Sequence, residues 1–391
     1  MRTYFPALMS HPTAPPRPAI PLVLLLADAT CLGILMPLLA SYAAQFEASS
    51  TAIGAMVAVY SLLQVLLAPF WGRLSDRYGR RPVLLLGLFG SFVSSVMFTV
   101  AGDFLVLALS RVVAGGLGGT INVTQAYAAD LTTPERRTRV MGYVGAAFGV
   151  GFVLGPTIGG IASGITPVAP GLVASVITGL NFLAALVLLP EVTRRRVETG
   201  APVRVSSRPF LVPFSAAFLS TLAFTVIYVV FPLHVEQALG FDRSGVSYLF
   251  ALLGLMTAVV QGGIVGRLSR WVGEGRLVIA GGGLMGLGLA GLAVTGTEPL
   301  ALYPALMTLG VGFGLAGPAE AGYVSRVADP VVQGRVLGLL QSVNSSARAI
   351  GPVAAGAVMS AGGAGLAFLA AAVAALGAAG LGTRMRGPRT P

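Results

Sequence analysis

The sequence has few of the residues that soluble enzymes and metalloproteins depend on. It contains one cysteine, two histidines and no lysine, and charged residues make up only 10% of its 391 positions. A single cysteine, Cys31, excludes an intrachain disulfide and is expected to act as a small apolar side chain. We find no Cys/His cluster for a metal, no GxxxxGK[ST] nucleotide loop and no Ser/His/Asp set. We therefore expect no cofactor, no ATP-driven transport and no enzyme activity.

Long apolar segments fill most of the chain. Hydrophobic residues account for 55% of it, and soluble proteins carry far more charge than this one. Each segment is near the ~20 residues that a helix needs to cross a bilayer, and only helices and barrels satisfy their backbone there. The sequence predicts an all-α membrane protein with twelve transmembrane helices, at 19–44, 52–72, 82–101, 104–129, 140–163, 168–189, 210–234, 245–265, 277–296, 299–325, 335–358 and 364–382.

The arginines indicate the orientation of these spans. All 25 basic residues are arginine, and with an internal N-terminus 22 fall in the tails and loops on the inner side. One, Arg243, falls outside, and two, Arg111 and Arg348, lie within spans. This asymmetry is a strong positive-inside signal, and it explains the net charge of +11 without a nucleic-acid partner. We expect a bacterial inner (plasma) membrane protein with both termini in the cytoplasm and no signal peptide.

The chain repeats itself once. A shift of 196 positions aligns Tyr127 with Tyr323 and Gly155-Pro156 with Gly351-Pro352, and the fragment GRLS recurs at a shift of 194. Two six-helix halves therefore share one template. The predicted organisation is a tail at 1–18, an N-terminal half at 19–189, a linker at 190–209, a C-terminal half at 210–383 and a tail at 384–391.

Three motifs give the chain a family resemblance. GRLSDRYGRR (72–81), LSRVVAGGLGG (109–119) and GAAFGVGFVLGPTIGG (145–160) resemble signatures of major facilitator transporters, and the last resembles the signature of drug:proton antiporters. The chain is most similar to the twelve-helix exporters that include the tetracycline efflux proteins. The resemblance implies the major facilitator fold, a monomer, and a central site lined by helices 1, 4, 7 and 10.

The first motif implies a conformational latch. In the family, its acid faces the N-terminus of helix 11 and the next arginine pairs with an acid ending helix 4, which holds the outward-open state. The alternative is that these arginines serve membrane topology alone. In the second copy Arg270 replaces the acid, so we expect a one-sided latch, formed by Gly72, Asp76, Arg77, Gly79, Arg80 and Asp130.

Charges inside spans predict proton coupling. An arginine within a span is costly and normally faces a cavity or a partner, and Arg111 shares one helix face with Gly115. Asp28 lies roughly 13 Å into helix 1 from the inner side and Arg111 roughly 11 Å into helix 4 from the outer side, so their heights are similar. We expect Asp28 to carry the proton beside Arg111, with Glu320 as a second candidate; the alternative is a fixed ion pair.

Polar side chains on the other lining helices complete the predicted cavity. The helix-11 residues share one face, and the predicted substrate-cavity residues are Asp28, Asn122, Gln125, Tyr228, Phe313, Glu320, Gln341, Asn344 and Arg348. The antiporter signature is expected to form a tightly packed, bendable helix at the interface of the halves. Its residues are Gly145, Gly149, Gly151, Gly155, Pro156, Gly159 and Gly160.

These features predict a secondary transporter that exports small amphipathic compounds in exchange for protons, with the lipid bilayer as its surroundings. The alternatives are a lipid-linked or metabolite exporter of the same fold and, in another class, a non-transporting receptor or scaffold. A receptor has no need for charges buried in the membrane. The chain departs from tetracycline exporters in carrying Ser94 where they have an acid in helix 3, and in having no acid in 277–296.

Overall fold

The computed structural model is helical throughout the residues that it describes, which are 19–117, 123–124, 127, 134–190, 208–296, 298–329 and 332–385. Side chains are undescribed at 134–142, 145, 148 and 334. The predicted tail 1–18 and most of the predicted linker 190–209 lie outside this set. The described helices of the N-terminal half are α1 (Ala19–Ala44), α2 (Ser50–Tyr78), α3 (Arg80–Thr99), α4 (Phe104–Leu117), α6 (Pro134–Ser163) and α7 (Ala169–Leu188).

Two predicted spans of the C-terminal half are interrupted. The seventh consists of α8 (Leu211–Phe224), the 3₁₀ turn η2 (Thr225–Tyr228) and α9 (Val230–Leu239), preceded by η1 (Arg208–Phe210). The eighth consists of α10 (Arg243–Val259), a π-helical turn η3 (Val260–Ile264) and α11 (Val265–Val272). Such breaks are tolerated at membrane depth where they lie against other protein or a cavity.

The remaining helices are α12 (Glu274–Val294), α13 (Pro299–Val327) and α14 (Gln333–Gly382). The last contains both predicted spans 335–358 and 364–382, and it bends between them at Gly362 and Gly363. Gly363 has φ of +78°, a conformation that side chains with a Cβ rarely adopt. The bend therefore separates the two spans at a position where glycine is required.

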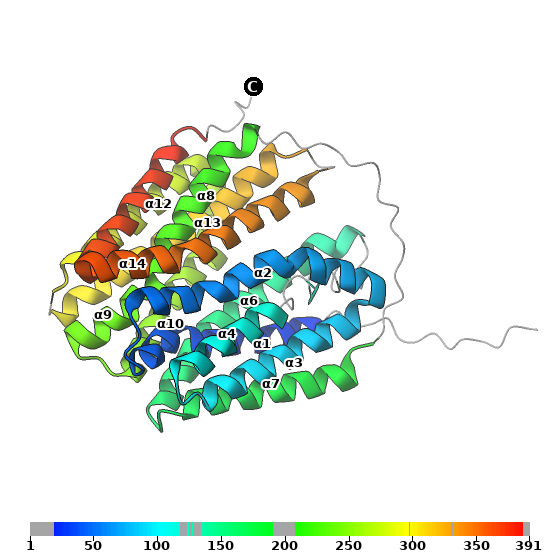
Figure 1. Cartoon of the computed structure of the whole chain (residues 1–391). Helices are drawn as coiled ribbons and strands as arrows, with labels where there is room; N and C mark the ends of the chain where they lie inside the picture. The colour runs from blue at the N-terminus through cyan, green and yellow to red at the C-terminus, as the bar shows by residue number, and fades with distance from the viewer. Residues whose placement is uncertain are drawn as a thin grey trace, which may run out of the picture.

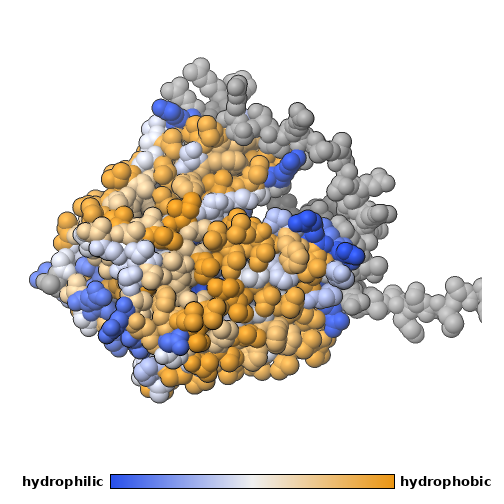
Figure 2. Space-filling model, viewed as in Figure 1, coloured by the Kyte–Doolittle hydropathy of each residue, from blue (hydrophilic) through white to orange (hydrophobic). Residues whose placement is uncertain are grey.

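The exterior is suited to lipid. Among the described residues, nine helices are long and apolar enough to cross a membrane, and two shorter apolar helices cover Phe104–Leu117 and Gly149–Ser163. Because one of the nine is the bent α14, the set is consistent with the twelve predicted spans. Large apolar side chains such as Leu66, Leu180 and Leu300 point outward, and Figure 2 shows apolar residues over most of the visible surface.

The two ends of the helix bundle differ in charge. We call the end with the arginine-rich loops the basic end; it includes the loop between α2 and α3 and the one between α11 and α12. The opposite end, where α1 and α9 finish, we call the acidic end, because the described residues of its loops and helix termini include five acids and a single arginine, Arg243. These acids are Glu47, Asp103, Glu236, Asp242 and Glu298.

The halves meet at the acidic end. Helices α2 and α14 lie side by side (Figure 1), and a Cβ added at Gly54 would lie 2.2 Å from the carbonyl oxygen of Pro352. The hydroxyls of Thr51 and Ser360 are 3.1 Å apart across the same contact. A second contact joins α6 to α10, where a Cβ at Gly160 would lie 2.8 Å from the Tyr248 ring.

The same helices separate toward the basic end. A Cβ added to any of the six glycines named below would meet no described heavy atom within 4 Å. Figure 2 shows the surface hollowed between the halves at this end. The halves are therefore closed at the acidic end and apart at the basic end. Several glycines elsewhere also lack such a neighbour; those on the helices that separate here are Gly72 on α2, Gly149 on α6, Gly262 and Gly263 on η3, Gly266 on α11 and Gly338 on α14.

The glycine ridge of the antiporter signature packs within one half. A Cβ at Gly151 would lie 2.8 Å from the Leu26 carbonyl oxygen, and one at Gly155 would lie 2.5 Å from that of Thr30. Gly159 faces Ile34 in the same way. The ridge therefore packs α6 tightly against α1, because its period of four residues matches the backbone of that helix. Among the described glycines of the signature, Gly160 on the adjacent face of α6 contacts α10 of the other half.

Candidate transport site

A small cavity in the N-terminal half brings Asp28 and Arg111 together. It has a volume of about 40 Å³, and both residues line it with Cys31, Leu35 and Tyr60. Helix α1 contributes Asp28, α4 contributes Arg111 and α2 contributes Tyr60. The two charges that the sequence placed at similar depth therefore face one enclosed space. Serines and a threonine from neighbouring helices complete the wall, namely Ser91, Ser94, Ser95 and Thr178.

Arg111 is held by hydroxyl groups. It is only 2% exposed, and its Nη2 donates to Ser94 Oγ at 3.0 Å while its Nε donates to Ser110 Oγ at 3.1 Å. The guanidinium also lies 5.8 Å from the centre of the Phe98 ring. Neutral hydroxyls orient the cation without neutralising it, so its charge stays available to the cavity. Ser94 occupies the position where the sequence departs from the tetracycline exporters.

Tyr60 lines the same cavity, although no feature of the sequence singled it out. Its hydroxyl accepts a hydrogen bond from Gln64 Nε2 at 2.8 Å, and the charges of Asp28, Arg111 and Arg348 all act on it. Helix α4 reaches it because a Cβ at Gly115 would lie 2.6 Å from the Tyr60 carbonyl oxygen. Gly115 therefore serves helix contact rather than the cavity lining. A tyrosine in an apolar span is unremarkable until that contact is known.

The C-terminal half adds Arg348 and Tyr228 near the same region. Arg348 Nη2 donates to Ser345 Oγ at 2.8 Å, and its charge acts on both Tyr60 and Tyr228. Tyr228 ends the 3₁₀ turn that breaks the seventh span, and its ring meets that of Phe224 edge to face. Phe313 stacks on Phe224 with ring centres 3.8 Å apart. The predicted residues Tyr228, Phe313 and Arg348 thus lie on adjoining helices of this half.

Glu320 occupies a separate position. It is 3% exposed, and its Oε1 accepts a hydrogen bond from Ser220 Oγ at 2.8 Å across the contact of α13 with α8. It does not line the cavity that holds Asp28 and Arg111.

Two predicted cavity residues of α14 have other surroundings. The side-chain oxygen of Asn344 accepts a hydrogen bond from the Thr221 hydroxyl at 3.2 Å, and Gln341 is exposed. The structure therefore brings Asp28 and Arg111 together, with Glu320 apart from them. Asn122, Gln125 and Asp130 lie outside the described residues.

The predicted latch loop makes its described contacts locally. Asp76 pairs with Arg80 at 3.0 Å, and Arg80 also donates to Ser75 Oγ at 2.8 Å. Arg77 lies over the Tyr78 ring at 5.4 Å. Gly79 ends α2 with φ of +98°, which only glycine adopts readily. A Cβ at Gly72 would meet no described atom within 4 Å, so the expected contact of α2 with helix α14 at this end stays a prediction.

The second copy of this loop has an ion pair of its own. Gly273 repeats the positive φ of Gly79, at +78°, and the next residue, Glu274, pairs with Arg326 at the end of α13. Arg270 does replace the acid at the position of Asp76, and the second loop carries a different acid four residues beyond it; the one-sided latch stays a prediction. By the repeat, Glu274 and Arg326 correspond to Arg80 and Asp130, so the charges are exchanged between the halves.

Comparisons with known proteins identify the family. Residues 22–352 match the Major Facilitator Superfamily, and a second match covers residues 214–391. The chain belongs to the major facilitator superfamily. The family resemblance and the fold class predicted from the sequence are confirmed, and the protein crosses the membrane several times.

Its similarity to drug exporters is substantial. The chain is 34% identical over 346 residues to the class E tetracycline resistance protein of Escherichia coli, covering 85% of each chain. It is 27% identical over 334 residues to multidrug resistance protein 1 of Bacillus subtilis (strain 168), covering 83% of this chain and 85% of that one. A bacterial homologue of the human lysosomal transporter Spinster, solved in an inward-facing and occupied conformation, has the same fold, with a TM-score of 0.76, 16% identity and coverage of 95% and 97%.

Proposed function

We propose that this chain is a proton-coupled exporter of small amphipathic compounds. The observation that carries the proposal is the cavity that Asp28 and Arg111 line together inside the membrane-spanning region. Burying a charged side chain within the membrane costs free energy, so such residues usually serve transport or proton transfer. The similarity to tetracycline and multidrug resistance proteins supports export of drug-like molecules. The different residue at Ser94 speaks for a substrate other than tetracycline.

Proton exchange at Asp28 is the proposed coupling step. When the carboxylate is ionised, Arg111 and the hydroxyl of Tyr60 stabilise it across the cavity. The substrate binds this site while Asp28 is ionised, and a proton that neutralises Asp28 removes the charge-assisted hydrogen bonds between its carboxylate and the substrate. Release of the substrate and uptake of the proton are thereby linked through one site. Glu320, bonded to Ser220, is the second proposed proton carrier and sits in the other half.

The proposed orientation places the basic end in the cytoplasm. The arginine asymmetry supports it, and both termini then lie on the inner side of the bacterial plasma membrane. The structure would accordingly represent the inward-open state, separated at the cytoplasmic end and closed outside. In this state the contact of Gly54 with Pro352 holds the outer side shut. We further propose that Asp76 and Arg77 engage helix α14 and Asp130 when the basic end closes, and that the protein works as a monomer.

An efflux assay tests the function. The chain and its Asp28→Asn variant are expressed in cells lacking their own pumps, and susceptibility and dye efflux are measured across a panel that includes tetracycline, with and without a protonophore. We expect resistance to amphipathic compounds that the protonophore abolishes and that Asp28→Asn loses. Export insensitive to the protonophore would exclude proton coupling. Absence of any drug phenotype would favour the lipid-linked or metabolite exporter.

A further inference from the structure

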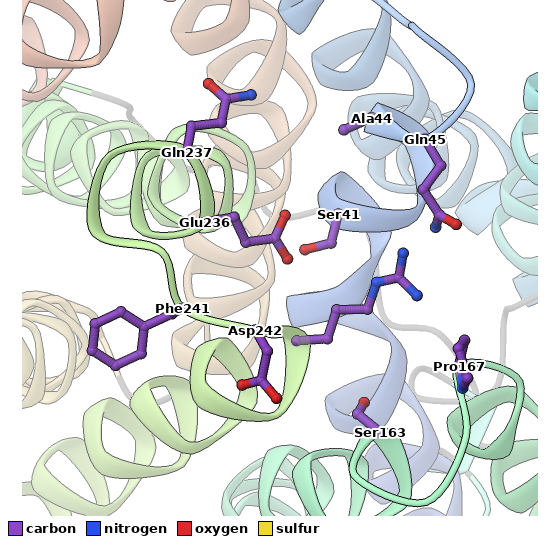
Figure 3. A pocket seen from close by; sticks show the side chains of 10 residues that line it. Ser41, Ala44, Gln45, Ser163, Pro167, Glu236, Gln237, Phe241 and Asp242 are labelled. Carbon is purple, nitrogen blue, oxygen red and sulfur yellow. The ribbon is translucent and has the colours of Figure 1, made fainter.

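A second, larger pocket lies at the acidic end, between the two halves. Its volume is about 560 Å³, and it shares no lining residue with the cavity of Asp28. The N-terminal half contributes the end of α1 and the connection between α6 and α7, and the C-terminal half contributes the end of α9 and the start of α10. Figure 3 shows Glu236 and Ser41 pointing toward one another across the junction of the halves. The lining residues are Ser41, Ala44, Gln45, Ser163, Pro167, Glu236, Gln237, Phe241, Asp242 and Arg243.

Polar atoms without partners gather at this pocket. Glu236 Oε1, Ser41 Oγ and Ser163 Oγ line it, are shielded from solvent, and have no described partner within 3.5 Å, although the Ser41 side chain and the charge of Arg243 both act on Glu236. Ser41 is only 3% exposed. Three other such atoms, on Tyr42, Ser244 and Ser247, belong to the same helices. Buried polar groups are normally satisfied, so an unsatisfied carboxylate oxygen beside two unsatisfied hydroxyls indicates a missing donor.

The charges around the pocket favour a cation. Glu236 and Asp242 are acidic, and the one base, Arg243, already lies 4.5 Å from the centre of the Tyr42 ring. Asp242 accepts from the backbone N–H of Gly245 as the cap of α10, and Glu236, which faces Ser41, is the second carboxylate at the pocket. The remaining acids of this end, Glu47, Asp103 and Glu298, add a negative field that concentrates cations nearby. Phe241 and Pro167 supply apolar walls for a small organic group.

We propose that this pocket binds an organic ammonium group that arrives from the acidic side of the membrane. The ammonium N–H groups donate to Glu236 and to the hydroxyls of Ser41 and Ser163, and the attached apolar group packs on Phe241. Because both halves line the pocket, such a ligand stabilises the closed acidic end and slows the opening that export needs. This regulatory consequence rests on the proposed export function; the binding itself does not.

Binding is measured on the full-length protein in lipid nanodiscs. The probe is 4-fluorobenzylammonium, titrated by ¹⁹F NMR, and the matched neutral probe is 4-fluorobenzyl alcohol. We expect saturable binding of the ammonium but not of the alcohol. Glu236→Gln removes the charge-assisted hydrogen bond and weakens binding about tenfold or more. Glu47→Gln removes an exposed acid of the same end outside the pocket and leaves the affinity unchanged.

Two further variants keep the result interpretable. Asp28→Asn alters the central cavity, and binding that survives it belongs to the outer pocket whether or not the protein transports. Ser41→Ala removes a small buried hydroxyl and should weaken ammonium binding several-fold. This variant tests the same site independently if Glu236→Gln does not fold. Equal binding of the alcohol, or unchanged ammonium affinity in both Glu236→Gln and Ser41→Ala, would overturn the proposal. A drug-efflux assay with no phenotype would instead count against the export function alone.

Discussion

The guanidinium of Arg243, at the start of α10, lies 4.5 Å from the centre of the Tyr42 ring near the end of α1. The only arginine that the sequence places on the outer side thus joins the two halves across the closed acidic end. A cation over an aromatic face contributes about 0.5–1 kcal/mol at an exposed site. The contact is small beside the whole interface, but it must break each time this end opens.

Removing the cation should therefore favour opening of the acidic end. We expect Arg243→Gln to shift the ratio of open to closed molecules by about two- to fivefold, and Arg243→Lys to shift it less. Spin labels at Glu47→Cys and Glu298→Cys, which are exposed on opposite halves, report the distance in Cys31→Ser protein. Identical distance distributions in all three proteins would show that Arg243 does not contribute to closure.

Two glycines of α2 should act in opposite directions. Gly54→Ala places a methyl group against the Pro352 carbonyl and disfavours the closed acidic end. Gly72→Ala meets no described atom in this conformation, but it crowds the contact of α2 with α14 that the closed basic end is expected to form. Label distances at both ends should shift oppositely in the two variants. Equal shifts, or a shift at Gly54 alone, would contradict the proposed contact at Gly72.

Asp28 and Arg111 should be separable by function. Asp28→Asn should abolish uphill export and preserve folding, because the amide keeps the shape of the carboxyl group but cannot carry the proton. If the two residues form only a structural pair, the double variant Asp28→Asn with Arg111→Gln should be more stable than either single variant. We expect the double variant to be stable and still inactive in proteoliposomes with an imposed pH gradient. Full uphill export by it would move the proton pathway to Glu320.

The Glu274–Arg326 pair should stabilise the C-terminal half at its basic end. Glu274 has a side chain only 13% exposed and Arg326 one that is 48% exposed, so we expect either charge-removing variant to cost about 1 kcal/mol. Thermal unfolding in detergent measures the loss. The exchanged variant, Glu274→Arg with Arg326→Glu, should recover most of it, since the N-terminal half has Arg80 and Asp130 at the corresponding positions. No recovery would mean that the pair has no energetic coupling.

Hydropathy predicted most helix positions but not their interruptions. The segment 168–189 became α7 at Ala169–Leu188, because lipid thickness determines both the apolar run and the helix. Helix α2 continues to Tyr78, six residues beyond the predicted span, since a helix need not end where the lipid does. The breaks at 225–229 and 260–264 carry no proline, and they depend on contacts that hydropathy does not record.

The part of the site that depends only on how deep a residue lies in the membrane could be predicted from the sequence. Asp28 and Arg111 meet because counting residues along two spans fixes their heights in the membrane. Tyr60 was missed because its place depends on how closely α4 approaches α2 at Gly115. The partner of the glycine ridge of α6, which is α1, could not be predicted, since a small-residue stripe predicts close packing without naming the neighbour. The ion pair of Glu274 was missed because the motif was compared only at the position of Asp76.

Between the two cavities, α1 forms an electrical insulator. Leu35 lines the Asp28 cavity and Ser41 lines the outer pocket, and in the roughly 9 Å between them Leu38 and Leu39 pack with Val229 and Leu233 of the other half. A buried apolar layer gives water molecules no hydrogen-bonding partners, so no water chain can conduct protons through it. In this conformation we therefore expect the layer to block proton leakage between the two cavities, so that the resting transporter would not dissipate the proton gradient of its cell.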